Sequence, residues 1–198
     1  MEKLILFGIL SLPLIFISRR SLFTPSSHGF YRFFSWECIL WLLLSNYKFW
    51  FENPFAPKQI FSWVLLIASI YYVAAGSIFL VKKGKPAKTK EREELFRFEK
   101  TTELVDRGIF RYIRHPLYGS LLLLTWGIFL KNTSSTLFLI SLISTLFLYL
   151  TALFDEKECI HYFGNQYLDY MKEPGCSSHS YFNTLWSGKL DFASFCYI

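Results

Sequence analysis

The architecture of this chain follows from residues 117–154, which read LYGSLLLLTWGIFLKNTSSTLFLISLISTLFLYLTALF. Two apolar runs, Leu117–Leu130 and Leu137–Phe154, flank the short polar turn Lys131–Ser134. A helix needs about 20 apolar residues, within a range of about 17–25, to cross a bilayer. Two apolar runs joined by a tight turn predict a helical hairpin. The start of the first run and the end of the second must then lie at the same membrane face.

Three further apolar segments, Leu4–Ile17, Phe33–Phe51 and Ile60–Val81, precede this hairpin. The second, third and fifth of the five segments are long enough to span a bilayer, whereas the first and fourth need flanking residues. Only 18% of the 198 residues are charged, below the roughly 25% of a soluble domain. We therefore predict an all-α, multi-pass membrane helical bundle with about five transmembrane helices, a C-terminal helical hairpin and cytoplasmic amphipathic segments.

Basic residues predict the orientation of the bundle. The loop Lys82–Arg114 contains eleven Lys and Arg against six acidic residues. With this loop, the first loop and the C-terminal tail in the cytoplasm, that side holds seventeen basic residues and the other side four, as the positive-inside rule requires. Because the basic loop lies between apolar segments, we expect it to face anionic lipid headgroups rather than nucleic acid. The four cysteines show no CxxC spacing, so neither a metal site nor a disulfide framework is predicted.

The first candidate motif is Arg114-His115-Pro116-Leu117-Tyr118, at the start of the hairpin. Pro116 suits the first turn of a helix, where its missing N–H costs nothing. The helix N-terminus carries a partial positive charge, and Arg114 and His115 add donors beside it. An anionic group such as a carboxylate would be well held there, with Tyr118 within reach of the same ligand. An interfacial anchor, with a snorkelling Arg and a Tyr in the aromatic belt, is an equally good explanation from the residues alone.

The second candidate motif is the acidic pair Asp155-Glu156, at the end of the hairpin. Carboxylates near a helix C-terminus oppose the helix dipole, so a compensating cation is expected nearby. Neighbouring helical positions point about 100° apart, and we expect Glu156 to face the ligand while Asp155 supports it. A solvated acidic helix end is the alternative. His28 and His161 are expected to be interfacial or solvated. The two motifs together predict a pocket for a ligand that carries both a carboxylate and cationic groups.

These motifs, in this order, resemble the isoprenylcysteine carboxyl methyltransferase and phospholipid methyltransferase superfamily. The resemblance covers about Phe98 to Met171 and includes the stretch FGNQYLDY at residues 163–170. Residues 27–34 and 59–63 are similar to a bacterial branch of that family. The resemblance implies S-adenosylmethionine as cofactor, bound by Arg114, His115, Pro116, Tyr118, Asp155 and Glu156. It also implies a lipophilic acceptor in a bacterial cytoplasmic membrane, with the active site facing the cytoplasm; the family usually has two Glu where this chain has Asp155-Glu156.

Two other functions stay open at this point. Sterol-reductase-like membrane enzymes that use NADPH carry a related Arg-His-x-x-Tyr element, although they usually have more spans. An inactive relative of the methyltransferases is the second alternative. The acceptor, whether a prenyl-cysteine carboxylate, a phospholipid amine or another lipophilic group, and the oligomeric state do not follow from the sequence. Methyl transfer from a sulfonium needs alignment and exclusion of water more than an acid–base pair, so we name no catalytic base.

The tail, residues 173–198, diverges from the family and limits the predicted methyltransferase domain to residues 1–172. Codons that encode Lys172–Asn183 can be chosen so that one added A gives Lys-Arg-Thr-Arg-Met-Phe-Ile-Pro-Phe-Leu-Phe and then a stop. That ending is the kind the family has. We hypothesise that a one-base loss replaced the native ending from Glu173 on, which would impair activity; a natural divergent tail is the alternative. Sequencing the coding DNA tests this, because codons that forbid the alternative reading would contradict it.

Overall fold

The computed structural model describes residues 1–85 and 101–172 of the chain. The tail 173–198 and residues 86–100 of the basic loop lie outside the described residues. The described part is helical without strands, which confirms the predicted all-α class. Its α-helices are α1 (Glu2–Leu22), α2 (His28–Asn46), α3 (Pro57–Lys83), α4 (Pro116–Phe129), α5 (Ser135–Phe163) and α6 (Asn165–Lys172), with 3-10 turns at Tyr47–Phe49 (η1) and Gly108–Arg111 (η2).

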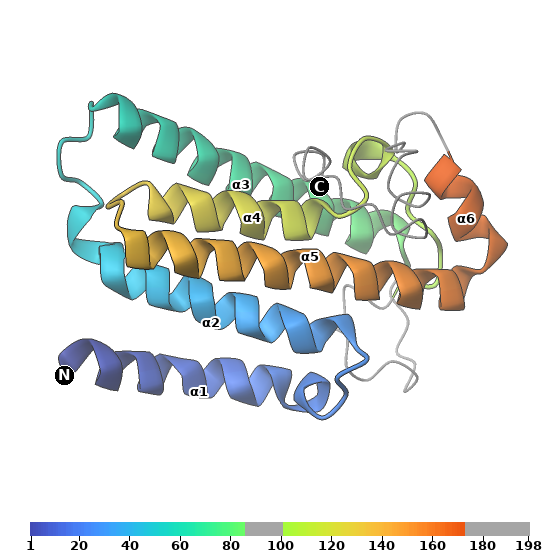
Figure 1. Cartoon of the computed structure of the whole chain (residues 1–198). Helices are drawn as coiled ribbons and strands as arrows, with labels where there is room; N and C mark the ends of the chain where they lie inside the picture. The colour runs from blue at the N-terminus through green and yellow to red at the C-terminus, as the bar shows by residue number, and fades with distance from the viewer. Residues whose placement is uncertain (86–100, 173–198) are drawn as a thin grey trace.

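Helices α1 to α5 lie side by side in the spatial order α1, α2, α5, α4 and α3 (Figure 1). The α4–α5 hairpin forms as predicted, and Ser134 caps α5 by accepting the Leu137 N–H at 3.3 Å. Because successive helices alternate in direction, one end of the bundle gathers the starts of α2 and α4 and the ends of α1, α3 and α5. Helix α6 lies at that same end.

Three helices, α1, α3 and α5, are long and apolar enough to cross a membrane, and α4 is a shorter apolar helix. The predicted span lengths need two corrections. Helix α1 reaches 21 residues because it continues beyond its apolar run. Helix α2 is not among the three: its helix stops at Asn46 and starts earlier, at His28, so it includes polar residues that lower its hydropathy. Large apolar side chains on α1, α3 and α5 point outward, as in an integral membrane protein.

Small hydroxyl side chains join the helices inside the bundle. Ser35 of α2 lies 3.0 Å from Ser144 of α5, and Ser144 lies 3.3 Å from Thr125 of α4. Ser69 of α3 donates to the Ser120 carbonyl of α4 at 2.8 Å. Small polar residues of this kind let membrane helices approach closely and form hydrogen bonds across them. They fix α4 and α5 in place, and the candidate site depends on that placement.

Helix α4 is short, and side chains of two other helices cap its C-terminal end. Asn46 donates to the Ile128 carbonyl at 2.8 Å, Ser62 to the Gly127 carbonyl at 2.6 Å and Gln59 to the Lys131 carbonyl at 3.0 Å. The last carbonyls of a helix have no partner within the helix, and leaving them bare in an apolar medium is costly. These caps allow α4 to end within the bundle at only 14 residues.

Replacing Asn46 with Ala should destabilise the bundle by about 1–2 kcal/mol, because a buried carbonyl loses its donor. Asn46 is fully buried, so water cannot easily replace it. Thermal unfolding of the detergent-solubilised protein measures the change. Thr133→Ala is the matched control, since Thr133 lies exposed in the nearby turn and should shift stability by less than about 0.5 kcal/mol. Equal stability of the two variants would contradict the capping role.

Candidate active site at one end of the bundle

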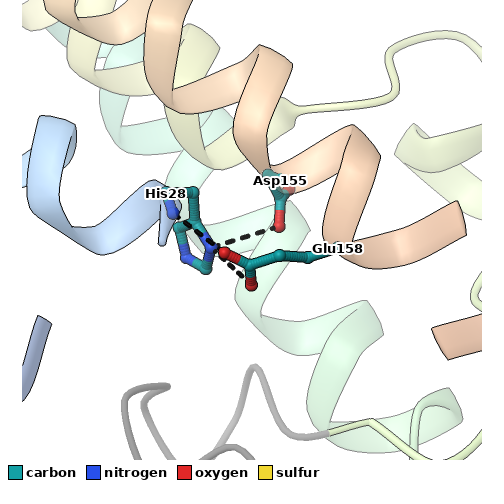
Figure 2. A group of neighbouring side chains, drawn as sticks. All are labelled: His28, Asp155 and Glu158. Carbon is teal, nitrogen blue, oxygen red and sulfur yellow. Dashed lines mark hydrogen bonds and ion pairs between the residues drawn. The ribbon is translucent and has the colours of Figure 1, made fainter. Parts of the chain in front are cut away.

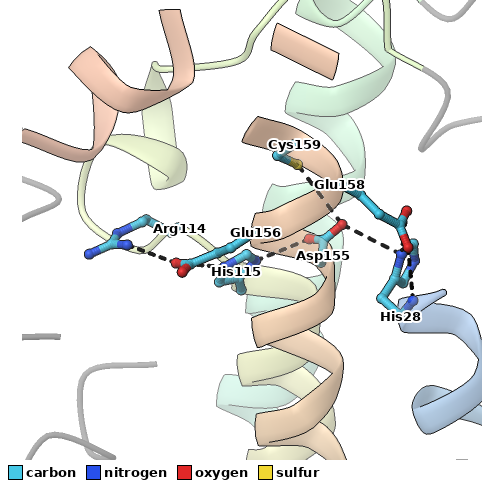
Figure 3. Close-up of polar contacts among 7 residues, drawn as sticks. All are labelled: His28, Arg114, His115, Asp155, Glu156, Glu158 and Cys159. Carbon is cyan, nitrogen blue, oxygen red and sulfur yellow. Dashed lines mark hydrogen bonds and ion pairs between the residues drawn. The ribbon is translucent and has the colours of Figure 1, made fainter. Parts of the chain in front are cut away.

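The two predicted motifs meet where α4 begins and α5 ends (Figure 3). The guanidinium of Arg114 donates through Nη1 to Glu156 Oε1 at 2.7 Å. The imidazole of His115 lies between both carboxylates, with Nδ1 3.2 Å from Asp155 Oδ2 and Nε2 3.4 Å from Glu156 Oε1. All four side chains are mostly buried, with 9–21% of each exposed. The hairpin therefore brings the donors of one helix against the acids of the next.

The roles of the two acids are the reverse of the expected arrangement. Asp155 lines the cavity described below, whereas Glu156 does not border it. Glu156 instead bridges Arg114 and His115. Both acids contact one imidazole even though adjacent helical positions diverge, because the two ring nitrogens lie on opposite edges of the ring. The sequence showed the pair but not the position of the ring between them.

Pro116 and Tyr118 form the first turn of α4. Pro116 occupies the first helical position and is buried, with its ring against Gly76 of α3, where an added Cβ would come within 3.2 Å. Tyr118 is 6% exposed, and its ring stacks on His115 with centroids 5.4 Å apart. The stacking holds the imidazole from one side while the carboxylates hold its edges.

His28 belongs to this site, and the expectation that it is interfacial or solvated is wrong. It is 1% exposed, and its Nδ1 lies 3.0 Å from Glu158 Oε2 and 3.7 Å from Asp155 Oδ1 (Figure 2). The signal in the sequence was the spacing of Asp155 and Glu158, because residues three apart share a helix face and two carboxylates there call for a cation. The ligand atoms of these three side chains lie within 4.8 Å of one another, a spacing that would suit a divalent cation. The ion pairs with the histidine already account for it. His161, by contrast, is exposed.

A cavity of about 100 Å³ opens beside these residues. Its polar wall consists of His28, Arg114, His115 and Asp155. Apolar and aromatic side chains of α3, of the segment that precedes α4, and of α4, α5 and α6 form most of the remaining wall: Leu80, Leu104, Val105, Phe110, Pro116, Leu117, Tyr118, Cys159, Phe163, Tyr167 and Tyr170. Thr101 also borders the cavity. The cavity therefore offers donors and one carboxylate on one side and ring surfaces on the other.

Helix α6 closes the cavity because the chain reverses at Gly164. Gly164 has φ of +58°, a conformation that suits glycine, and α6 then folds back so that Tyr167, Tyr170 and Met171 are buried. Tyr170 donates its hydroxyl to the Phe110 carbonyl of η2. The sequence showed the Phe-Gly-Asn stretch but not this return, since a solvated continuation of α5 fits the same residues.

The charge of His115 depends on its two acidic partners. Burial alone would lower the pKa of His115, but the hydrogen bonds and charges of Asp155 and Glu156 raise that pKa from 6.5 to about 9. His115 is therefore protonated at neutral pH. An imidazolium between two carboxylates gives this part of the site a fixed charge pattern.

The raised pKa of His115 predicts a pH dependence of stability. A group whose pKa is higher in the folded state stabilises that state fully below its unfolded pKa, and this contribution is lost as the pH rises through the folded value. The wild-type unfolding temperature should therefore fall from about pH 6.5 to about pH 9. The fall should be smaller in His115→Asn, and the comparison removes groups that titrate in both proteins. Parallel curves for the two proteins would contradict the predicted pairing.

Comparison with known proteins places these features in a family. A family model described as phospholipid methyltransferase matches residues 66–166, just over half of the chain. The matched region contains the Arg114–Tyr118 motif and the acidic pair, and it leaves out His28. No curated protein and no solved structure matches the chain.

Proposed function

The chain belongs to the phospholipid methyltransferase family, and from this membership we propose that it transfers the methyl group of S-adenosylmethionine to a lipophilic acceptor. The observation that carries the proposal is the cavity whose polar wall joins Arg114 and His115 to Asp155. S-adenosylmethionine has a carboxylate and two cationic groups at one end and an aromatic adenine at the other. Donors, an acid and ring surfaces around one cavity match these features in kind.

The side of the cavity next to the first turn of α4 suits the carboxylate of the cofactor. The first turn of α4 has no side-chain cap, and the start of a helix favours an anion. Arg114 and His115 lie directly before this turn and both line the cavity. Glu156 holds both of them. In this proposal Glu156 acts by keeping the two donors in place.

The opposite side of the polar wall suits a cation. Among the described residues, Asp155 is the one carboxylate that lines the cavity. Its Oδ2 lies 3.2 Å from Nδ1 of His115, whereas its Oδ1 lies at the longer distance of 3.7 Å from Nδ1 of His28. Oδ1 is therefore the oxygen best placed to receive an ammonium group of the ligand. The tyrosines and phenylalanines of the remaining wall offer faces on which an adenine ring can stack.

Bound S-adenosylmethionine supplies an electrophilic methyl group on sulfur. The protein residues contribute position and exclusion of water, which are the main requirements of such a displacement. The apolar and aromatic side chains that line the cavity keep water away, and the fixed charges of the polar wall orient the ligand. Attack by a carboxylate acceptor needs no proton transfer, whereas a phospholipid amine must first lose its ammonium proton, a step for which we assign no side chain.

The acceptor is proposed to enter from the bilayer. Leu80 near the end of α3 and Leu117 at the start of α4 border the cavity, and α3 carries exposed apolar side chains along its length. A prenyl-cysteine carboxylate or a phospholipid amine would satisfy the same apolar route. We propose that this end faces the cytoplasm, because Arg19, Arg20, Lys82 and Lys83 lie there, where anionic lipid headgroups can meet them.

A methyl-transfer assay tests the proposal. Purified protein in lipid nanodiscs receives S-adenosylmethionine labelled in its methyl group, and label is counted in the organic extract. Label in the extract that depends on protein and is absent for Asp155→Asn supports the proposal. The assay is run in parallel on a chain that carries the restored family-like ending after Lys172. Failure of both chains to transfer label to added phospholipids and prenyl-cysteine compounds would reject it.

A further inference from the structure

We propose that His28 is a positioning residue of the methyl-transfer site, which fixes the carboxylate of Asp155 toward the cavity. The inference rests on the proposed function, because it assumes that Asp155 receives the cationic end of S-adenosylmethionine. It assigns a role to a residue of α2 that lies outside the matched family region, 66–166.

Glu158 holds the imidazole of His28 in one orientation. One carboxylate oxygen of Glu158 accepts the backbone N–H of His28 at 2.9 Å, and the other lies 3.0 Å from Nδ1 of the ring. The first contact caps the start of α2, where an acidic group is favourable. The second contact fixes the rotation of the ring. A single glutamate thus fixes both the backbone and the side chain of His28.

Asp155 lies between two imidazoles that come from different helices. Nδ1 of His28 lies 3.7 Å from Oδ1, and Nδ1 of His115 lies 3.2 Å from Oδ2. Each ring therefore faces one oxygen of the same carboxylate (Figure 3). The carboxylate of an aspartate can rotate about its Cα–Cβ and Cβ–Cγ bonds, so it gains a defined orientation when both of its oxygens are engaged. All three residues line the cavity, so the orientation of this carboxylate affects the binding of a ligand in the cavity.

The surroundings of His28 indicate that it does more than cap a helix. Glu158 accepts the backbone N–H of His28 and Ser27 Oγ accepts that of Gly29, so capping α2 does not require an imidazole. Tyr118, which borders the cavity, has its ring centroid 6.3 Å from that of His28. The charge of Arg32, one turn further along α2, also acts on both His28 and Asp155. The ring thus lies between the acids of α5 and the first turn of α4.

A double-mutant cycle distinguishes positioning from capping. His28→Asn keeps a donor near Nδ1 but removes the charge and the ring. We expect this variant to weaken S-adenosylmethionine binding about tenfold, because the carboxylate of Asp155 loses its ion pair at Oδ1. In the background of Asp155→Asn the same change should cause no further loss, because the positioned group is already gone. A capping role predicts instead that the two losses multiply, and that result would overturn the proposal.

Two further variants keep the outcome interpretable. Glu158→Gln removes the charge that orients the ring of His28. Like His28→Asn, it should cause no further loss of affinity in the background of Asp155→Asn. It replaces His28→Asn in the cycle if that variant fails to fold. His161→Asn is the matched control, since His161 is exposed on the same helix as Asp155, and it should bind like the wild type. If the wild type binds S-adenosylmethionine but the losses of the two single variants multiply in the double variant, only the role of His28 is rejected and the proposed function stands. Failure of both the folded wild type and the chain with the restored ending to bind would reject the proposed function, and the inference with it.

Discussion

Asp155→Asn is expected to weaken S-adenosylmethionine binding about 100-fold, and Glu156→Gln about tenfold. Asp155 lines the cavity and lies between two imidazoles, so its loss removes the site for a cation and leaves both rings facing a neutral amide. Glu156 does not line the cavity and acts through Arg114 and His115, which it contacts. Its loss should disturb the donors without removing a contact to the ligand. Isothermal titration in detergent measures both affinities.

The affinity loss of Asp155→Asn should exceed that of Glu156→Gln, and this order tests the geometry of the site. Asp169→Asn is the matched control, because Asp169 is 74% exposed on α6 and pairs with Lys172; its affinity should equal that of the wild type. The unfolding temperature of each variant shows whether a lost affinity reflects a lost fold. A larger effect of Glu156→Gln than of Asp155→Asn would contradict the geometry of the site.

Gly108→Ala is expected to destabilise the protein by about 3 kcal/mol. Gly108 has φ of +68°, and a Cβ added there would lie 2.2 Å from the ring of Phe79 on α3. An L-residue at positive φ costs about 1–2 kcal/mol, and forcing extra volume into a packed site costs about 1–3 kcal/mol more. Because Gly108 begins η2, which places Phe110 on the cavity wall, ligand affinity should fall with stability.

Gly8→Ala provides the control for this glycine. Gly8 lies in α1, and nothing lies within 4 Å of a Cβ added there. Alanine in a helix is favoured over glycine by about 0.8–1.0 kcal/mol, so this variant should unfold at the same or a higher temperature. If Gly108→Ala unfolds at the temperature of the wild type, the close approach of η2 to α3 is not as described.

Much of the fold could be predicted from local patterns. The lengths of the apolar runs around Lys131–Ser134 determine a hairpin, and a hairpin necessarily places Arg114 and His115 at the same end as Asp155 and Glu156. This reasoning needed no knowledge of how the other helices pack. The span lengths were less predictable, because the caps of α4 by Asn46, Ser62 and Gln59 depend on tertiary contacts.

The parts of the site that sequence reasoning missed are tertiary. His28 follows no local pattern, since its partners are 127 and 130 positions away along the chain. The roles of Asp155 and Glu156 depend on where a ring from another helix enters between them. The return of α6 depends on the backbone conformation of Gly164. Each of these features requires knowing which helix faces which.

An S-adenosylmethionine titration of the detergent-purified chain tests the central claim most directly, because that claim is that the cavity binds this cofactor. The account predicts saturable binding that S-adenosylhomocysteine displaces and that Asp155→Asn loses, with no binding of NADPH. The account is contradicted if this chain and the chain with the restored ending both unfold cooperatively on heating, yet neither shows saturable binding of S-adenosylmethionine.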